Sequence, residues 1–134
     1  MSIKEYPRLG EKVFRRRLSN GLEVVVVNKP CHAKSYAFFA VRYGGMDMRF
    51  QLGGQWQDTP AGIAHYLEHK MFDSETGDVM QAFAKNGASD NAFTSSVITA
   101  YYVTCTEKFY ENLRILLEYV STPYFTQESA EKER

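Results

Sequence analysis

Residues 61–72 have the sequence AGIAHYLEHKMF, and this stretch lies at the centre of the expected fold. We expect a helix from Ala61 to Phe72, because Thr59 suits an N-cap and Pro60 suits the first helical position. Residues four apart stand on one face of a helix, so His65 and His69 can point at the same spot.

The two histidines and the carboxylate between them have the composition of a metal site. Neutral imidazole nitrogens are good ligands for first-row metals, and zinc is the usual occupant of such a pair. Glu68 borders the same spot, where its carboxylate can take a proton from water that the metal activates. The order His-x-x-Glu-His is the inverted form of the commoner His-Glu-x-x-His helix. The alternative is an amphipathic helix whose histidines only cover a core, and the loop and glycines around the motif favour the metal site over it.

Two histidines do not complete a catalytic zinc site, which normally takes three protein ligands and leaves one position for water. The spacing of the candidates leaves the third ligand open. Cys105 lies on an expected strand, where a cysteine is usually a small buried hydrophobe, and His32 follows a strand end. The acidic residues near the C-terminus are most simply a solvated helical face. These acidic candidates are Glu128, Glu131 and Glu133.

Toward the N-terminus, the residues have the pattern of β structure. Lys12 to Leu18 and Leu22 to Asn28 flank Ser19-Asn20-Gly21, and Asn-Gly supplies the positive φ angles that a tight hairpin turn requires. A third strand is expected from Ser35 to Tyr43, which is rich in aromatic and small apolar residues. The first third of the chain is therefore expected to form strands.

Two segments flank the central helix. Met46 to Pro60 is expected to form a long loop, because Gly53-Gly54 interrupts it and long ordered loops are more often functional than accidental. A second helix is expected from about Asp78 to Lys85, closed by Asn86-Gly87 as a C-cap.

The last third of the chain combines strands and helices. Ala92 to Ser96 and Ile98 to Thr106 are expected to be strands, because Thr, Tyr, Val and Phe dominate them. Thr106 is expected to cap a further helix, which Pro123 stops, and another helix is expected to start at Thr126. One apolar stripe at helical spacing marks the first of these helices, formed by Phe109, Leu113, Leu116 and Val120. This order of elements predicts an α+β fold, with a mostly antiparallel sheet and helices packed on one face.

Composition limits the class of protein. The chain has 134 residues, the length of one ordinary domain, and its 44% apolar and 24% charged residues are typical of a soluble globular protein. Sixteen Lys and Arg balance sixteen Asp and Glu, so nothing in the charge favours nucleic acid as a partner. No apolar run approaches the roughly 20 residues that span a bilayer, and residues 1–17 lack the apolar region of a signal peptide. Cys31 and Cys105 form no disulfide framework. We therefore expect a single cytoplasmic domain with neither nucleic-acid nor membrane partners.

Three blocks of the sequence resemble one protein family. Residues 62–69, followed by Met71-Phe72, resemble its active-site helix, and residues 87–94 with Thr99 to Tyr102 resemble its second block. The stretch from Leu117 to Phe125 resembles the segment that leads into the helix with its third ligand. The family is the pitrilysin/insulinase family of zinc metallopeptidases, which includes the mitochondrial processing peptidases. The similarity is greatest to bacterial members with two similar halves.

The resemblance implies an activity and a role for each residue of the motif. His65 and His69 would bind zinc, and Glu68 would be the general base that activates water against a peptide bond. Asn91 and Ala92 would lie on an exposed edge strand that pairs with the backbone of a peptide or small unfolded protein. From the residues alone, Asn91 would instead be a turn residue before a strand.

The resemblance also implies that residues 1–134 are the N-terminal part of one peptidase half. The family's third ligand is a Glu two helical turns beyond another acidic residue. Glu133 matches that upstream residue, so the ligand would lie just past Arg134 and the chain alone would be inactive or nearly so. A homologous second half supplies further contacts in the family. We therefore expect pairing with such a half, or self-association through the surface that it would cover.

Two other functions stay open beside the zinc-dependent endopeptidase. A non-catalytic subunit of the same fold would bind peptides or a partner half, but it would have no chemical reason to retain His65, Glu68 and His69. The S-ribosylhomocysteine lyases share the inverted motif and a related fold, and they use a Cys as third ligand, which would be Cys105 here. Residues 91–94 resemble the peptidases and make the lyase the least favoured of the three.

Overall fold

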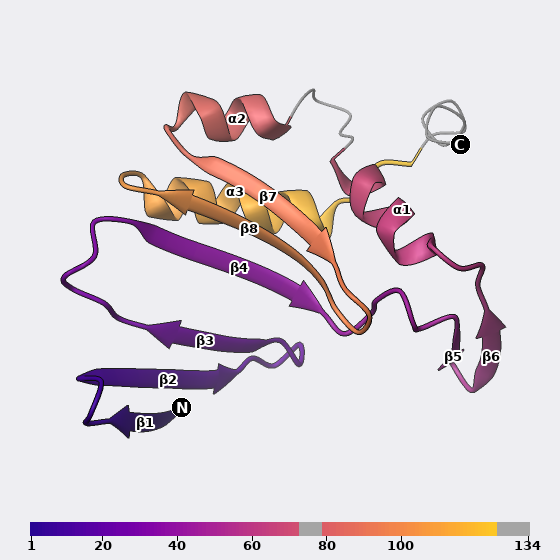
Figure 1. The fold of residues 1–134 in the computed structure, drawn as a ribbon, viewed down its shortest axis with the longest axis horizontal. Coiled ribbons are helices and arrows are strands. Elements are labelled where there is room, and N and C mark those ends of the chain that lie inside the picture. Colours follow the sequence, from indigo (N-terminus) through magenta and orange to yellow (C-terminus); the bar gives the residue numbers. More distant parts are fainter. Residues whose placement is uncertain (73–78, 126–134) are drawn as a thin grey trace. The chain divides into compact units, whose positions relative to one another are not determined.

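The computed structural model of the chain describes residues 1–72 and 79–125, and the chain divides into two compact units, Met1–Ala33 and Lys34–Arg134 (Figure 1). No helix in the described ranges is long and apolar enough to cross a membrane.

The first unit is a three-stranded antiparallel meander. Its strands are β1 (Ser2–Tyr6), β2 (Glu11–Arg17) and β3 (Glu23–Val27), in the order β1-β2-β3. The predicted hairpin is confirmed, with Gly21 at a positive φ of 90° and the Leu18 amide nitrogen donating to the Leu22 carbonyl oxygen at 2.8 Å. The sequence did not predict β1, whose five residues alternate too weakly between polar and apolar to mark a strand.

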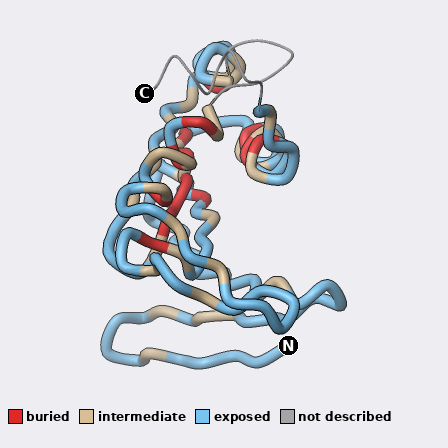
Figure 2. Tube along the Cα trace, turned by 90° about the vertical axis from the view of Figure 1, so that its right-hand side faces the viewer, coloured by how far each residue is buried: buried red, intermediate tan, exposed pale blue. Residues whose placement is uncertain are grey.

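No residue of the first unit is buried (Figure 2). The four valines of β3, Val24 to Val27, are 36–51% exposed although they have the composition of a buried strand. Backbone pairing rather than an apolar core of its own therefore defines this unit.

The second unit contains the sheet and the helices. The antiparallel sheet has the order β4-β8-β7, so β4 and β7 are its two edge strands within the described residues. A separate two-stranded sheet pairs β5 with β6. The strand bounds are Ser35–Val41 for β4, Arg49–Leu52 for β5, Gln55–Asp58 for β6, Ser89–Thr94 for β7 and Thr99–Cys105 for β8. The helices are α1 (Ile63–Met71), α2 (Val79–Lys85) and α3 (Phe109–Ser121).

Side chains from all three helices meet one face of this sheet. Phe83 of α2 and Leu116 of α3 are almost completely buried against Ala37 and Val103 of the strands, and Met71 of α1 packs against the same cluster. The predicted apolar stripe of α3 belongs to this core. The α+β fold with helices on one face of an antiparallel sheet is thereby confirmed.

The opposite face of the sheet carries exposed aromatic side chains. Tyr36 and Phe38 of β4 alternate with core residues, and their ring centroids are 6.1 Å apart. Tyr102 of β8 lies 5.3 Å from Tyr36, and Phe93 of β7 lies 6.1 Å from Phe38. The sheet is therefore apolar on both faces, but only one face is covered by the helices.

The predicted loop before α1 was wrong, because it contains the β5–β6 hairpin. Gly53 and Gly54, taken as loop residues, have φ angles of 58° and 82° and form the hairpin turn, which requires these left-handed conformations. Thr59 does not cap α1, since its amide nitrogen and its Oγ1 both bond to the Met48 carbonyl oxygen, at 2.8 and 3.2 Å. Gly62, at φ 88°, occupies the N-cap position instead.

The other helix boundaries follow the predictions with small shifts. The predicted closure of α2 is confirmed, with Gly87 at φ 67° and its amide nitrogen bonded to the Ala84 carbonyl oxygen. Helix α3 is capped at Lys108 rather than at Thr106. The helix predicted from Thr126 lies outside the described residues.

Candidate active site

Helix α1 places its acidic residue and its two histidines in different environments. Ala64, Glu68 and Met71 recur at helical spacing on the side that faces the sheet, and Glu68 is only 7% exposed. His65 and His69 lie on the exposed side of the helix. A buried carboxylate therefore stands directly beside two accessible imidazoles.

The two imidazoles converge as the spacing predicts. His65 Nε2 and His69 Nε2 are 3.0 Å apart, and the rings lie edge to face with centroids 4.6 Å apart. Two nitrogens bound to one tetrahedral zinc at 2.0–2.1 Å would be roughly 3.3 Å apart. The spacing of the pair therefore fits a shared metal ion.

Strand β7 holds the carboxylate of the motif. Thr94 Oγ1 donates a hydrogen bond to Glu68 Oε2 at 2.6 Å. This length is at the short end of the range for hydrogen bonds between two oxygens. The bond joins residues 26 positions apart in the sequence and uses one of the two carboxylate oxygens.

The negative charge of Glu68 contributes to raised pKa values at two buried tyrosines, Tyr101 and Tyr119. Burial, and then the negative charge of Glu68, raises the pKa of the Tyr101 phenol to about 12. Burial raises the pKa of Tyr119 further, and Tyr101, Asp90 and Glu68 add to that rise in this order. Both phenols therefore stay protonated at neutral pH.

Strand β7 offers one open edge to solvent or to a partner chain. The Ser95 amide nitrogen bonds the Ile98 carbonyl oxygen at 2.8 Å, and bonded and non-bonded pairs alternate in an antiparallel ladder. The backbone groups of Thr94 and Ala92 therefore point away from β8. The Ala92 amide nitrogen bonds instead to Oδ1 of Asn91 at 2.8 Å, so this edge donor is covered by a neighbouring side chain. Asn91 lies within a strand and not in a turn.

The described residues do not supply a third metal ligand. No group of three His, Cys, Asp or Glu side chains in residues 1–72 and 79–125 lies close enough to hold a metal ion. Cys105 is a buried free thiol at the end of β8, and His32 is exposed in the first unit beside the exposed free thiol of Cys31. The acidic candidates Glu128, Glu131 and Glu133 lie outside the described residues.

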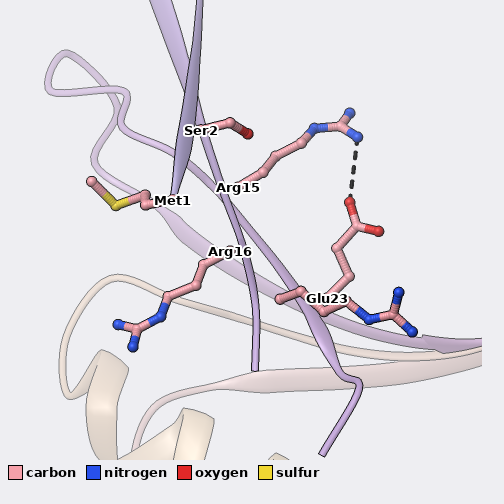
Figure 3. A pocket seen from close by; sticks show the side chains of 6 residues that line it. Met1, Ser2, Arg15, Arg16 and Glu23 are labelled. Atoms are coloured by element: carbon pink, nitrogen blue, oxygen red, sulfur yellow. Dashed lines mark hydrogen bonds and ion pairs between the residues drawn. The ribbon is translucent and has the colours of Figure 1, made fainter. Parts of the chain in front are cut away.

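The first unit has an arginine-lined hollow of its own (Figure 3). Arg15 Nη1 reaches Glu23 Oε1 at 3.4 Å, while Arg16 points to the opposite side of the strand. The two guanidinium groups therefore do not converge on one point, and the hollow contains no histidine or cysteine that could extend a metal site.

Helix α1, packed on one face of an antiparallel sheet, carries the His-x-x-Glu-His order of the inverzincin motif. A family profile described as Insulinase (Peptidase family M16) matches residues 52–134, which is more than half of the chain. The chain belongs to this family. The resemblance to the pitrilysin/insulinase peptidases is thereby confirmed.

Similar sequences and solved structures support the family assignment. The zinc protease YmfH of Bacillus subtilis is 46% identical over 132 residues, which cover 97% of this chain and 31% of YmfH. An M16-like peptidase from Alicyclobacillus acidocaldarius has a structure that matches with a TM-score of 0.89 and 41% identity, over 97% of this chain and 30% of that one. The structure of pitrilysin matches with a TM-score of 0.72 and 25% identity, over 92% of this chain and 13% of pitrilysin. The chain therefore spans less than a third of each of these relatives.

Sequence reasoning found the three motif residues but not their surroundings. Thr94 belongs to a block that the sequence singled out, yet nothing in the sequence indicated that its hydroxyl contacts Glu68. Tyr101 and Tyr119 were expected only as strand and helix residues. Such contacts depend on how distant segments pack together, and the local patterns of a single sequence do not predict them.

Proposed function

We propose that this chain carries the catalytic helix of a zinc-dependent endopeptidase. The observation that carries the proposal is the convergence of His65 Nε2 and His69 Nε2 at 3.0 Å beside a buried carboxylate. An amphipathic helix whose histidines only cover a core would need neither converging imidazoles nor a buried carboxylate beside them. The zinc protease YmfH, at 46% identity, supports the same metal and the same class of reaction.

His65 and His69 would hold the zinc ion, which when bound supplies a Lewis acid that makes water nucleophilic near neutral pH. Glu68 is the general base. Its carboxylate takes one proton as the oxygen of water bonds to the carbonyl carbon of the peptide. It then returns that proton to the amide nitrogen as the carbon–nitrogen bond breaks. Protons and electrons balance without any further reactant.

The peptide substrate would add as a strand to the open edge of β7. Asn91 and Ala92 would receive it, because the backbone groups of Ala92 point away from β8 and are free to pair once the Asn91 carboxamide moves aside. An extended peptide or a small unfolded protein fits this mode, since a folded chain does not present a free backbone.

The proposals for the third zinc ligand and for the partner rest on the resemblance to the family. A Glu placed past Arg134 would complete the zinc site, with Glu133 as the acidic residue upstream of it. A homologous second half would close over the peptide, and the exposed aromatic face of the sheet supports pairing with such a half or with a second copy. We also place the protein in the cytoplasm, where the free thiols of Cys31 and Cys105 would stay reduced.

Elemental analysis of zinc tests the metal site first. We expect little zinc in the 134-residue chain and about one zinc per chain in a version continued past Arg134 with the corresponding segment of YmfH. His65→Ala in the continued version should lose the zinc, whereas His32→Ala, the matched control, should keep it. Full occupancy in the 134-residue chain would instead indicate a ligand within it, and Cys105→Ser would show whether the lyase alternative applies.

Cleavage of an unstructured peptide by the continued version tests the reaction. Glu68→Gln should keep the zinc and lower the cleavage rate by about 100-fold or more, because a general base contributes on that order. A Glu68→Gln variant that cleaves normally would contradict the assignment of the base.

A further inference from the structure

The carboxylate of Glu68 is held by a residue that the motif does not contain. Glu68 is 93% removed from solvent, and the Thr94 hydroxyl donates to its Oε2 at 2.6 Å. A carboxylate on a flexible side chain can rotate, and a bond to one oxygen fixes the direction of the other. Among the described residues the hydrogen bond to Glu68 engages Oε2, which leaves Oε1 as the oxygen to receive a proton.

The Thr94 hydroxyl itself sits on a rigid part of the sheet. Thr94 is the last residue of β7 and pairs with Thr99, whose Oγ1 donates to the Tyr43 carbonyl oxygen at 2.8 Å. The turn that follows is tied to the segment after β4, since Gly45 donates from its amide nitrogen to the Ser95 carbonyl oxygen at 2.9 Å. The end of β7 is therefore fixed by two neighbouring segments.

The turn between β7 and β8 also leaves no room for adjustment at Gly44. A Cβ atom on Gly44 would lie 2.5 Å from the Ser95 carbonyl oxygen and 2.5 Å from the Val97 amide nitrogen. The backbone of Gly44 therefore lies directly against the backbone of this turn, in a space that only glycine fits. Thr94 is consequently a fixed donor, and the Glu68 carboxylate is the group that it orients.

The same strand that holds the base carries the open edge. Ala92, whose backbone groups point away from β8, lies two residues before Thr94 on the same side of β7. We propose that Thr94 is the positioning residue of this site: its hydroxyl aims the free oxygen of Glu68 and sets the base in register with a peptide added to β7. This inference rests on the proposed function, which it deepens by linking peptide binding to the orientation of the base.

Thr94→Val tests the inference, because it removes the hydroxyl and keeps the shape of the side chain. In the version continued past Arg134, we expect kcat for peptide cleavage to fall about 100-fold, the order that a displacement of about 1 Å costs. KM should stay within about twofold and zinc content should be unchanged, because neither the edge nor the histidines are altered. Thr94→Ser, which restores the hydroxyl, should recover most of the lost kcat.

A control separates this effect from a general weakening of the sheet. Thr104→Val removes a hydroxyl from neighbouring β8, where it bonds the Ser89 carbonyl oxygen at 3.4 Å, and it should leave kcat unchanged. If Thr94→Val unfolds at the assay temperature, Thr94→Ala and Thr94→Ser are compared instead. The variant with a hydroxyl, Thr94→Ser, should then have the higher kcat. A crystal structure of the folded variant should show the Glu68 carboxylate turned while the backbone of α1 stays in place.

The outcomes are distinct. Wild-type cleavage with an equal kcat in Thr94→Val would overturn the role of Thr94 and leave the proposed function intact. A fall in zinc content that matches the fall in kcat would also overturn it, since the residue would then support the metal site and not the base. Absence of zinc and of cleavage in the wild-type continued version would overturn the proposed function, and with it this inference.

Discussion

The two units of the chain each contain a three-stranded antiparallel sheet, and they differ in what supports it. The sheet β1-β2-β3 has no buried residue, whereas the sheet β4-β8-β7 packs Ala37 and Val103 against Phe83 and Leu116 of the helices. Strand pairing without a core is marginally stable in water. The His-x-x-Glu-His motif lies in the unit with the core, where close packing fixes the positions of side chains.

The largest expected difference between the units comes from removing a core side chain. Phe83→Ala leaves a cavity at a position with no exposed surface and should lower the free energy of unfolding by about 3–5 kcal/mol. Urea denaturation followed by circular dichroism measures this change. A loss below about 1 kcal/mol would mean that the second unit does not depend on this core.

Alkaline pH should weaken the second unit through its buried tyrosines. The folded state holds the Tyr101 proton up to a pKa of about 12, whereas the unfolded chain releases it near 10, so unfolding releases a proton between these values. This contribution is complete below pH 10, and about 2–3 kcal/mol of stability is lost as the pH rises to 12, with Tyr119 acting in the same direction.

Denaturation curves at pH 9 to 12 check the direction and the residue. Tyr101→Phe should make stability less dependent on pH in this window. Tyr110→Phe, at a phenol that is 80% exposed, should leave the dependence unchanged. An unchanged slope in Tyr101→Phe would show that its phenol does not resist ionisation.

A methyl group at Gly44 should strain the second unit by an intermediate amount. The new Cβ would meet backbone atoms of the β7–β8 turn at 2.5 Å, and overpacking of this kind costs about 1–3 kcal/mol. Gly45→Ala is the matched control, because its Cβ meets the same carbonyl oxygen at an ordinary 3.7 Å. Equal urea midpoints for the two variants would argue against a close contact between Gly44 and the backbone of the β7–β8 turn.

The smallest effect is expected in the first unit. Val26→Thr on β3 keeps a β-branched side chain at a position that is 51% exposed, and it should change the free energy of unfolding by no more than about 0.5 kcal/mol. The same urea experiment measures it. A loss comparable to that of Phe83→Ala would remove the contrast between the units.

Local patterns predicted most of the helices and strands. Gly21 predicted the β2–β3 hairpin and Gly87 predicted the end of α2, because glycine accepts the positive φ angles that other residues avoid. Asn20 does not adopt a positive φ and contributes to the turn through its side chain, which accepts a hydrogen bond from the Leu22 amide nitrogen at 3.1 Å. The β5–β6 hairpin was missed, since Gly53-Gly54 fits a loop and a type of hairpin turn equally well. The N-cap of α1 was misplaced because Thr59 finds its partner eleven residues upstream, at Met48. The single-domain organisation stays a prediction.

The sequence predicted the part of the site that lies within helix α1, but not the contacts that other segments make with it. The four-residue spacing of His65 and His69 determines their convergence, so it could be read from the sequence and was confirmed in the structure. The hydroxyl that holds Glu68 comes from a strand, and its arrival depends on how that strand packs on the helix. The third ligand stays a prediction, because the described residues do not supply one.

The bond between the Asn91 carboxamide and the Ala92 amide has a consequence for the behaviour of the protein in a crowded cell. A bare edge strand is a template for any extended chain, and pairing between copies leads to aggregation. At Ala92 the donor is already satisfied within the strand, so an incoming chain must displace a side chain before it can pair. Protection of the edge at this position thus comes from one asparagine, and its removal should make the protein more prone to aggregation.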